Sequence, residues 1–372
     1  MSTLIEATLK RHFEDFIVEE IPLYLPCGTG EHVYVTFEKR GKNTLDVVRD
    51  IARALGANQR DVGVAGMKDK YAVTRQTISL TAPRGQKTEE FAERALQLAI
   101  DGVRILSVGR HNNKLRTGHL EGNKFEIVLR DIDPLRLQEG CERSMALTSG
   151  VPNAFGEQRF GRGKDNAERA RAWLRGEEAP PRDHKKKRLL YSALQSAVFN
   201  AVLDRRVSEG TWRTPILGDV LEKTDSGGRF VCTDVEVDRE RALRGEVVPT
   251  GPMLGPKMVK PEADAATLEA EVAASFLGED EIVSMLTNAS GLGEGTRRPL
   301  VLPVQKLSVE PISPSDGEQP TGCRVYFVIP KGAYATTVLA QVFVWKEQIA
   351  PAIAETESNS EASQPEGSHR DD

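Results

Sequence analysis

The chain has 372 residues, of which 39% are hydrophobic and 28% charged, and its formal net charge is −5. This length favours two domains over one compact core, and the charged fraction is ordinary for a soluble protein. The sequence has no apolar run near the roughly eighteen residues of a membrane span, no readable secretory signal, and only four cysteines, far apart (Cys27, Cys141, Cys232 and Cys323). A disulfide framework, a zinc cluster and a membrane protein are thereby disfavoured, and a cytoplasmic protein with reduced thiols is expected.

Charge is unevenly distributed along the sequence. Beyond Ala352 the chain carries six acidic residues and one arginine, so this tail accounts for the net charge and the rest is about neutral. Two stretches of the neutral part, G-R-H-N-N-K-L-R (109–116) and R-D-H-K-K-K-R (182–188), are strongly basic. Such clusters are typical of phosphate contacts, although a solvated surface is the ordinary alternative.

Strands and helices alternate over the first 150 residues. In residues 32–39, Val33, Val35 and Phe37 share one face, which predicts a half-buried strand. A helix is expected next, capped at Asn43 or Thr44 and ended by Gly56, with a shared apolar face of Leu45, Val48, Ile51 and Leu55. Further strands are expected at 62–64, 77–80, 103–110 and 124–130, and a further helix at 88–100.

The pattern changes after residue 150. Helices are expected at 167–174, 189–207 and 263–276, with a hairpin turning at 226–228 and a Gly/Pro-rich loop at 249–256. Strand signals return at 298–305 and 324–330, which favours a second domain inserted into the first. The Ser/Glu-rich segment beyond Ala354 has almost no apolar residues and is predicted to be disordered.

One stretch contains a candidate catalytic residue. In V-A-G-M-K-D-K-Y-A-V-T-R-Q-T-I-S-L (64–80), the carboxylate of Asp69 lies between Lys68 and Lys70. A nucleophilic carboxylate must be ionised, and adjacent cations favour that state. Because neighbours on a strand point to opposite faces, at most one of these lysines helps directly. A turn aspartate is the alternative, and for a lone K-D pair it is the better interpretation.

Six motifs occur in a fixed order over most of the chain. They are K-R-H-F-E-D-F-I-V-E-E (10–20), A-G-M-K-D-K-Y-A-V-T-R-Q (65–76), R-H-N-N-K-L-R-T-G-H-L-E-G-N-K-F (110–125), G-V-P-N-A-F-G-E-Q-R-F-G (150–161), Y-S-A-L-Q-S-A-V-F-N (191–200) and I-P-K-G-A-Y-A-T-T-V (329–338). Together they resemble the TruD family of tRNA pseudouridine synthases. The chain departs from the family pattern at Phe13, where many relatives have proline, and at Gln341, and the segment 201–295 matches only loosely.

The resemblance implies roles for individual residues. It makes Asp69 the nucleophile that attacks or stabilises the sugar carbon of a uridine, as carboxylates do in glycoside chemistry. It makes Lys10 a charge partner of Asp69, with a surface lysine as the alternative. The residues that it places around the target base are Phe16, Asn123, Phe125 and Tyr334. For these the alternatives are core packing for Phe16, a turn for Asn123 and a packed strand end for Tyr334.

Further RNA contacts are predicted from charge. The side chains expected at the RNA backbone are Arg159, in G-E-Q-R-F-G, and the basic cluster of Arg182, Lys185, Lys186, Lys187 and Arg188. Thr74 and Gln76 are expected to buttress the loop of Asp69 rather than touch substrate.

The resemblance also implies a mixed α/β (α+β) fold. A pseudouridine synthase catalytic domain with a bent mixed sheet is expected at 1–153 and 299–352, a smaller inserted α/β domain, the TRUD domain, at 154–298, and a disordered acidic tail at 353–372. The implied substrate is tRNA, with uridine 13 of the D-arm flipped onto Asp69, no metal or organic cofactor, and a monomeric protein. The alternatives are a non-catalytic RNA-binding or RNA-folding protein, a pseudouridine synthase acting on another RNA and, as a poor third, a metal-dependent nuclease.

Overall fold

The computed structural model describes residues 3–161, 163–287, 291–313 and 319–349, and the chain divides into two units. The first unit comprises 1–148, 304–335 and 339–372, and the second comprises 149–303 and 336–338. Both units combine helices with strands, so the mixed α/β class expected from the sequence is confirmed. The predicted disorder of the acidic tail concerns residues 353–372, which lie outside the described residues. In the described ranges, none of the helices has the length and apolarity that a membrane crossing requires.

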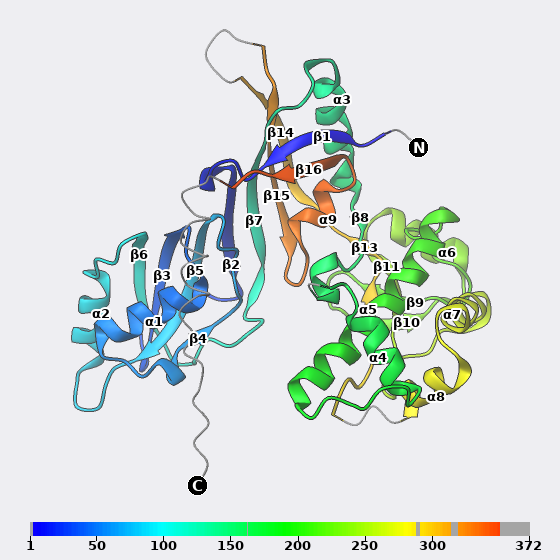
Figure 1. Ribbon diagram of the computed structural model, residues 1–372, viewed down its shortest axis with the longest axis horizontal. Coiled ribbons are helices and arrows are strands. Elements are labelled where there is room, and N and C mark those ends of the chain that lie inside the picture. Colours follow the sequence, from blue (N-terminus) through cyan, green and yellow to red (C-terminus); the bar gives the residue numbers. More distant parts are fainter. Residues whose placement is uncertain (1–2, 162, 288–290, 314–318, 350–372) are drawn as a thin grey trace, which may run out of the picture. The chain divides into compact units, whose positions relative to one another are not determined.

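A mixed sheet forms the body of the first unit (Figure 1). Among the described residues its strands run in the order β14-β15-β7-β2-β5-β3-β6, with β4 alongside β5, and a separate parallel pair joins β1 to β16. Within the larger sheet, β2 and β5 pair in parallel and the other neighbours are antiparallel. The strands are β1 (Ile5–Leu9), β2 (Phe16–Pro22), β3 (His32–Arg40), β4 (Gly63–Val64), β5 (Val73–Thr81), β6 (Val103–His111), β7 (Leu120–Leu129), β14 (Gln305–Ile312), β15 (Gly322–Pro330) and β16 (Phe343–Glu347).

Helices α1 (Thr44–Leu55) and α2 (Thr88–Leu96) pack on the core side of β3 and β5. Strand alternation turns Phe37 to that side, where it belongs to one buried cluster with Ile51 of α1 and Phe91 of α2. The expectation that Leu45 shares the buried face of α1 is wrong. Leu45 is 57% exposed because it lies at the edge of the apolar stripe, and Val47 is buried in its place.

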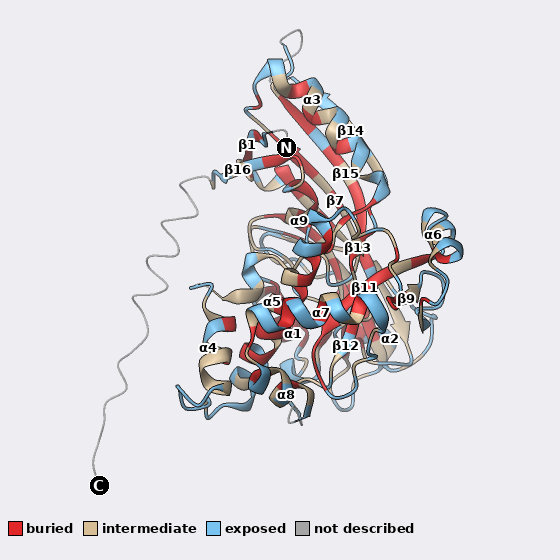
Figure 2. Cartoon of the chain, turned by 90° about the vertical axis from the view of Figure 1, so that its right-hand side faces the viewer, coloured by how far each residue is buried: buried red, intermediate tan, exposed pale blue. Residues whose placement is uncertain are grey.

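The second unit has its own sheets and helices. In the described part of the chain, one sheet has the order β10-β9-β11-β12 and a short pair joins β13 to β8. Buried residues of α5 pack with those of α4, α7 and α8 in a separate core (Figure 2). The elements are β8 (Val151–Pro152), α4 (Asn166–Leu174), α5 (His184–Ser208), β9 (Val220–Lys223), β10 (Arg229–Val231), α6 (Val235–Leu243), β11 (Val247–Met253), α7 (Ala263–Phe276), α8 (Glu279–Thr287), β12 (Thr296–Pro299) and β13 (Val301–Leu302).

Most predicted elements are present, but a predicted loop is instead part of a strand. The hairpin at 226–228 is confirmed by the pairing of β9 with β10, and the helix at 263–276 is confirmed as α7. The Gly/Pro-rich segment 249–256 was expected to be a loop, yet its first half lies in β11, hydrogen-bonded on both sides. The predicted strand 298–305 is divided among β12, β13 and the start of β14. The sequence patterns did not predict α3 (Pro134–Met145), α6, α8 or α9 (Ala335–Leu339), nor the short 3-10 turns η1 (Phe13–Asp15), η2 (Gln59–Asp61), η3 (Ala146–Ser149) and η4 (Glu157–Phe160).

Candidate active site

Asp69 lies in the loop of residues 65–72, which joins β4 to β5 in the first unit. The loop is fixed to the start of α1 because the hydroxyl of Thr44 accepts a hydrogen bond from the Lys68 backbone N–H at 3.1 Å. The Gln76 amide donates to the same hydroxyl at 3.4 Å, which supports this anchor from β5. One carboxylate oxygen of Asp69 accepts the Tyr71 backbone N–H at 3.1 Å. Asp69 therefore closes a local turn with Oδ1 and has Oδ2 available for a second contact.

Lys10 makes that second contact. Its Nζ lies 2.7 Å from Oδ2 of Asp69 and 3.1 Å from Glu347 on β16. Burial disfavours the charged form of Lys10, but the hydrogen bonds and charges of Asp69 and Glu347 outweigh it and raise the Lys10 pKa above its usual value. Its side chain is only 9% exposed, so the surface-lysine alternative is wrong. Lys10 has φ +57°, a conformation that non-glycine residues seldom adopt, directly after β1.

A second buried lysine holds the backbone of the candidate nucleophile. The Nζ of Lys39 donates to the carbonyl oxygen of Asp69 at 2.7 Å, and Lys39 is fully buried. Burial lowers the Lys39 pKa to about 8, with the nearby charge of Lys68 acting in the same direction and that of Asp69 opposing it. Lys39 occupies this place because it continues the alternation of Val35 and Phe37 on the core side of β3.

The two lysines next to Asp69 in sequence take other partners. Lys68 pairs with Glu20 of β2, Nζ to Oε2 at 2.8 Å, and their side chains are 6% and 3% exposed. The Nζ of Lys70 lies 5.2 Å from the centre of the Tyr71 ring. Among the described contacts, a cation distant in sequence, Lys10, reaches the carboxylate of Asp69.

Three of the residues expected at the base lie on neighbouring strands. Phe16 begins β2, and its ring stands edge-on to that of Phe125 on β7, with the centroids 6.1 Å apart. Lys10 lies 4.9 Å from the centre of the Phe16 ring, which connects this aromatic pair to the Lys10–Asp69 pair. Asn123 stands opposite Glu20 in the β2–β7 register, and its Oδ1 is buried without a hydrogen-bond partner among the described residues. Since buried polar atoms are normally satisfied, this oxygen is a candidate acceptor for a ligand donor.

The remaining sequence-predicted residues are arranged differently. Tyr334 follows β15, is 39% exposed, and has no described contact with the residues above. The buried Thr74 hydroxyl has no partner in the described part of the chain, whereas Gln76 supports the loop through Thr44. In the second unit, Arg159 donates to the hydroxyls of Ser192 and Ser196, the latter at 3.1 Å.

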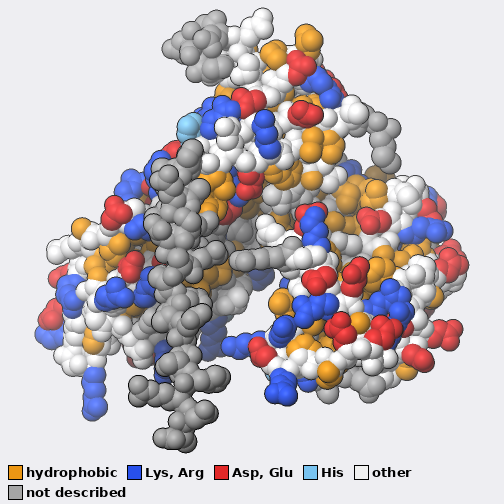
Figure 3. All heavy atoms as spheres, viewed as in Figure 1, with side chains coloured by type: hydrophobic (Ala, Val, Ile, Leu, Met, Phe, Trp, Pro, Cys, Tyr) orange, Lys and Arg blue, Asp and Glu red, His pale blue; other side chains and the backbone are white. Residues whose placement is uncertain are grey.

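The basic cluster lies at the beginning of α5. All its members are exposed except the half-buried Lys187, and none makes an ion pair within the described residues. Elsewhere on the visible face of the second unit, Lys and Arg side chains are mixed with Asp and Glu (Figure 3). The basic cluster consists of Arg182, Lys185, Lys186, Lys187 and Arg188.

Sequence reasoning did not identify Lys39, Glu20 or Glu347 as parts of this site. Lys39 had a readable signal, because a charged residue in register with a core face is unusual. Glu20 had the same signal, since it alternates with Phe16 and Val18 on β2. Glu347 had none, because it reaches Lys10 only through the parallel pairing of β1 with β16.

The comparisons with known proteins identify a family. The family model for tRNA pseudouridine synthase D matches residues 2–177 and 182–342. A tRNA pseudouridine synthase D of Anaeromyxobacter sp. is 42% identical over 90% of this chain and 92% of its own, and one of Thermus thermophilus is 38% identical over 88% and 86%. A crystal structure from Methanosarcina mazei, described as that of a "putative tRNA pseudouridine synthase D (TruD)", superposes with a TM-score of 0.75 at 23% identity, over 92% of this chain and 94% of its own. These matches define an enzyme family that modifies tRNA. The chain belongs to the TruD family of tRNA pseudouridine synthases.

Proposed function

We propose that this protein converts a uridine of cytoplasmic tRNA, uridine 13 of the D-arm, into pseudouridine, with Asp69 as the nucleophile. The observation that carries the proposal is the pairing of Asp69 with a buried ammonium group, Lys10 Nζ, at 2.7 Å. An opposite charge at this distance stabilises the ionised carboxylate that a nucleophile requires. The raised pKa keeps Lys10 charged at neutral pH.

The reaction needs a nucleophile at the sugar. Isomerisation breaks the bond from N1 to C1′ and joins C5 to C1′; the hydrogen of C5 leaves as a proton and N1 gains one, so no oxidant or reductant is consumed. Asp69 engages the electron-poor C1′ as the base departs, in the manner of a glycosidase carboxylate. The contacts of Lys39 and Lys68 hold the loop of Asp69, so that the Asp69 carboxylate is positioned before the substrate arrives.

The base must leave the RNA stack to reach Asp69. Phe16, beside Lys10, and Phe125 are assigned to the base from the family motifs; both are core residues, 5% and 7% exposed, so a base would contact only the exposed edge of this aromatic pair. The Oδ1 of Asn123, which has no partner among the described residues, can accept a hydrogen bond from a uracil N–H. Tyr334 is assigned to the same base from the family motif. The basic cluster at the start of α5 supplies phosphate contacts, and so does Arg159, whose guanidinium is hydrogen-bonded to two neutral serine hydroxyls and keeps its charge.

Tritium release tests the proposal. Unmodified tRNA labelled at C5 of uridine is incubated with wild-type protein and with Asp69→Asn, which preserves the side-chain shape. Wild type is expected to release one tritium per tRNA, and the variant to lose activity by at least about 10³-fold while binding tRNA. Mapping the product by sequencing then identifies the modified position.

The other outcomes separate the alternatives. Tight tRNA binding without release by wild type would favour an RNA-binding or RNA-folding protein. Release from other structured RNAs but not from tRNA would indicate a pseudouridine synthase with a different substrate. Equal release by wild type and Asp69→Asn would exclude Asp69 as the nucleophile.

A further inference from the structure

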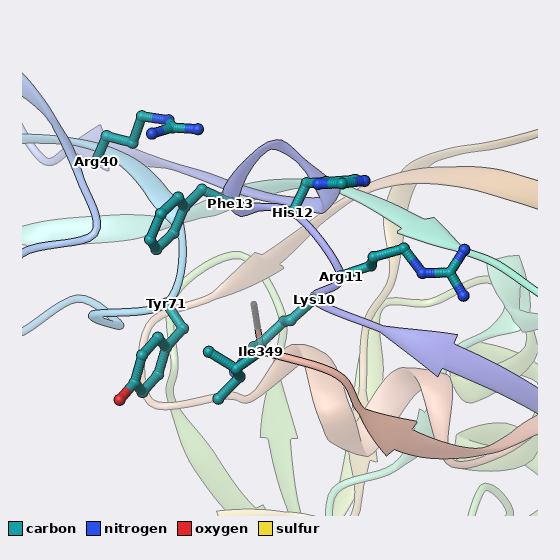
Figure 4. A pocket seen from close by; sticks show the side chains of 7 residues that line it. All are labelled: Lys10, Arg11, His12, Phe13, Arg40, Tyr71 and Ile349. Carbon is teal, nitrogen blue, oxygen red and sulfur yellow. The ribbon is translucent and has the colours of Figure 1, made fainter. Parts of the chain in front are cut away.

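A small pocket lies directly beside the Lys10–Asp69 pair. It has a volume of about 110 Å³ and is bordered by Lys10, His12, Phe13, Arg40 and Tyr71 (Figure 4). Lys10 belongs both to this pocket and to the candidate active site, because its Nζ contacts Asp69. The pocket is smaller than the roughly 300–1,000 Å³ of sites that enclose drug-sized ligands, so it suits one planar ring.

Two aromatic rings from separate segments form one side of the pocket. Phe13 belongs to the turn η1, and Tyr71 follows Asp69 by two residues in the β4–β5 loop; their rings lie on the same side in Figure 4. The Phe13 ring rests on Gly41, where an added Cβ would come within 2.7 Å of it. Tyr71 is tied to the nucleophile through its N–H, 3.1 Å from Oδ1 of Asp69.

The basic residues of the pocket are already engaged by acids. Arg40 donates to Glu14 at 2.7 Å, and its guanidinium lies over the Phe13 ring at 4.7 Å. Lys10 is shared between Asp69 and Glu347, and Arg11 pairs with Asp131 on the far side, its side chain directed away in Figure 4. Because these charges are neutralised within the protein, the pocket is suited to an uncharged aromatic ring rather than to a phosphate group.

We propose that this pocket receives the base of one nucleotide adjoining the target uridine, stacked on the rings of Phe13 and Tyr71. The inference rests on the proposed function. A nucleotide bonded to the target must lie close to Asp69, and flipping the target removes a stacking partner from its neighbour. Aromatic side chains replace such stacking and accept any base, since every base has a π face. The site is distinct from the one assigned to the target base, which involves Phe16, Asn123, Phe125 and Tyr334.

The test combines protein variants with tRNA substrates that lack one base. tRNA substrates are prepared with an abasic nucleotide on either side of the target, and kcat/KM is measured for wild type, Phe13→Leu, Tyr71→Leu and Tyr71→Phe. Leucine keeps apolar volume without a π face, so thermal unfolding should change little. Removing stacking of one base costs about 1–3 kcal/mol, which corresponds to a roughly 5- to 150-fold loss.

We expect each leucine variant to show this loss on intact tRNA, and Tyr71→Phe, which keeps the aromatic ring, to show a smaller loss than Tyr71→Leu. An abasic nucleotide at one flanking position should cause the same loss in wild type and no further loss in the leucine variants. Tyr326→Leu, which changes a half-buried tyrosine of the same unit outside the pocket, is the matched control.

Two outcomes would overturn the inference and are distinguishable. In the first, wild type isomerises tRNA, but at both flanking positions the loss of kcat/KM from the leucine substitution multiplies with the loss from the abasic nucleotide. The pocket then does not bind a flanking base, while the proposed function stands. If wild type does not isomerise any intact tRNA, the proposed function fails and the inference fails with it.

Discussion

The two basic regions of this protein use their charges in opposite ways. Around Asp69, the lysines at positions 10, 39 and 68 are largely buried, and each ammonium group lies within 2.8 Å of an oxygen. At the start of α5, Lys185, Lys186 and Arg188 are exposed and make no ion pair within the described residues.

The difference indicates which charges organise the protein and which are available to a ligand. A buried charge must be paired, because leaving it unpaired costs several kcal/mol, so the lysines near Asp69 fix the loop geometry. The α5 cluster has no such role. Cations at a helix N-terminus oppose the helix dipole, a cost of roughly 0.3–1 kcal/mol each that binding to RNA phosphates would offset.

The largest expected effect is on stability. Lys68→Met leaves the carboxylate of Glu20, 3% exposed, buried without its partner. Breaking a buried pair in this way should lower the free energy of unfolding of the first unit by about 3–5 kcal/mol. Denaturant unfolding measures the change.

The double variant Lys68→Met/Glu20→Gln removes both charges and should recover most of that loss. Lys185→Met in the α5 cluster is the matched lysine and should change stability by less than about 0.5 kcal/mol. Similar losses for Lys68→Met and Lys185→Met would contradict the distinction between the two regions.

The next effect is on the chemical step. Lys10→Met removes the charge-assisted hydrogen bond to Asp69, worth about 1.5–3 kcal/mol. If that bond stabilises the reacting carboxylate, the single-turnover rate should fall roughly 10- to 150-fold with little change in the tRNA dissociation constant. A change confined to the dissociation constant would make Lys10 an RNA contact instead.

A smaller effect is expected from the α5 cluster. Replacing Lys185, Lys186 and Lys187 with glutamine should weaken tRNA binding about tenfold and lower the slope of log Kd against log salt by about 2 to 3, because each phosphate contact contributes roughly 0.7–0.9. Lys257→Gln is the control, since the ammonium group of Lys257 is paired with the carboxylate of Glu294 at 2.9 Å. Its salt slope should match that of wild type. Equal slopes for the triple variant and wild type would remove the cluster from the RNA interface.

The sequence predicted those helices and strands whose hydrophobic periodicity or turn residues can be recognised within the segment itself. The alternation of 32–39 became β3, and the hairpin at 226–228 was recognised from its Ser-Gly-Gly turn. β11 was missed because local signals from proline and glycine outweighed the strand pattern, whereas pairing on both sides with β9 and β12 determines its conformation.

For the site, the motifs identified Asp69 and Lys10, which the structure places 2.7 Å apart. They could not indicate that Glu347 shares Lys10, because that contact depends on strands from opposite ends of the sequence. Residue order also suggested Lys68 and Lys70 as partners of Asp69. These residues lie in a loop rather than on a strand, and the folded loop turns Lys68 to Glu20 instead.

The smallest expected effect concerns Lys39 and pH. Its folded-state pKa of about 8 is below the ordinary value of 10.5, so between these two pH values the unfolded chain binds more protons than the folded chain. Stability therefore rises with pH across this window, by less than about 1.4 kcal/mol per pH unit from this group. The Lys10 pKa is raised instead, so its stabilising contribution is lost only above 10.5 and does not mask the effect. Lys39→Met should abolish the rise when unfolding free energies are compared at pH values of about 8 and 9. If the free energy of unfolding rose equally in wild type and variant, Lys39 would not be the group that titrates in this pH range.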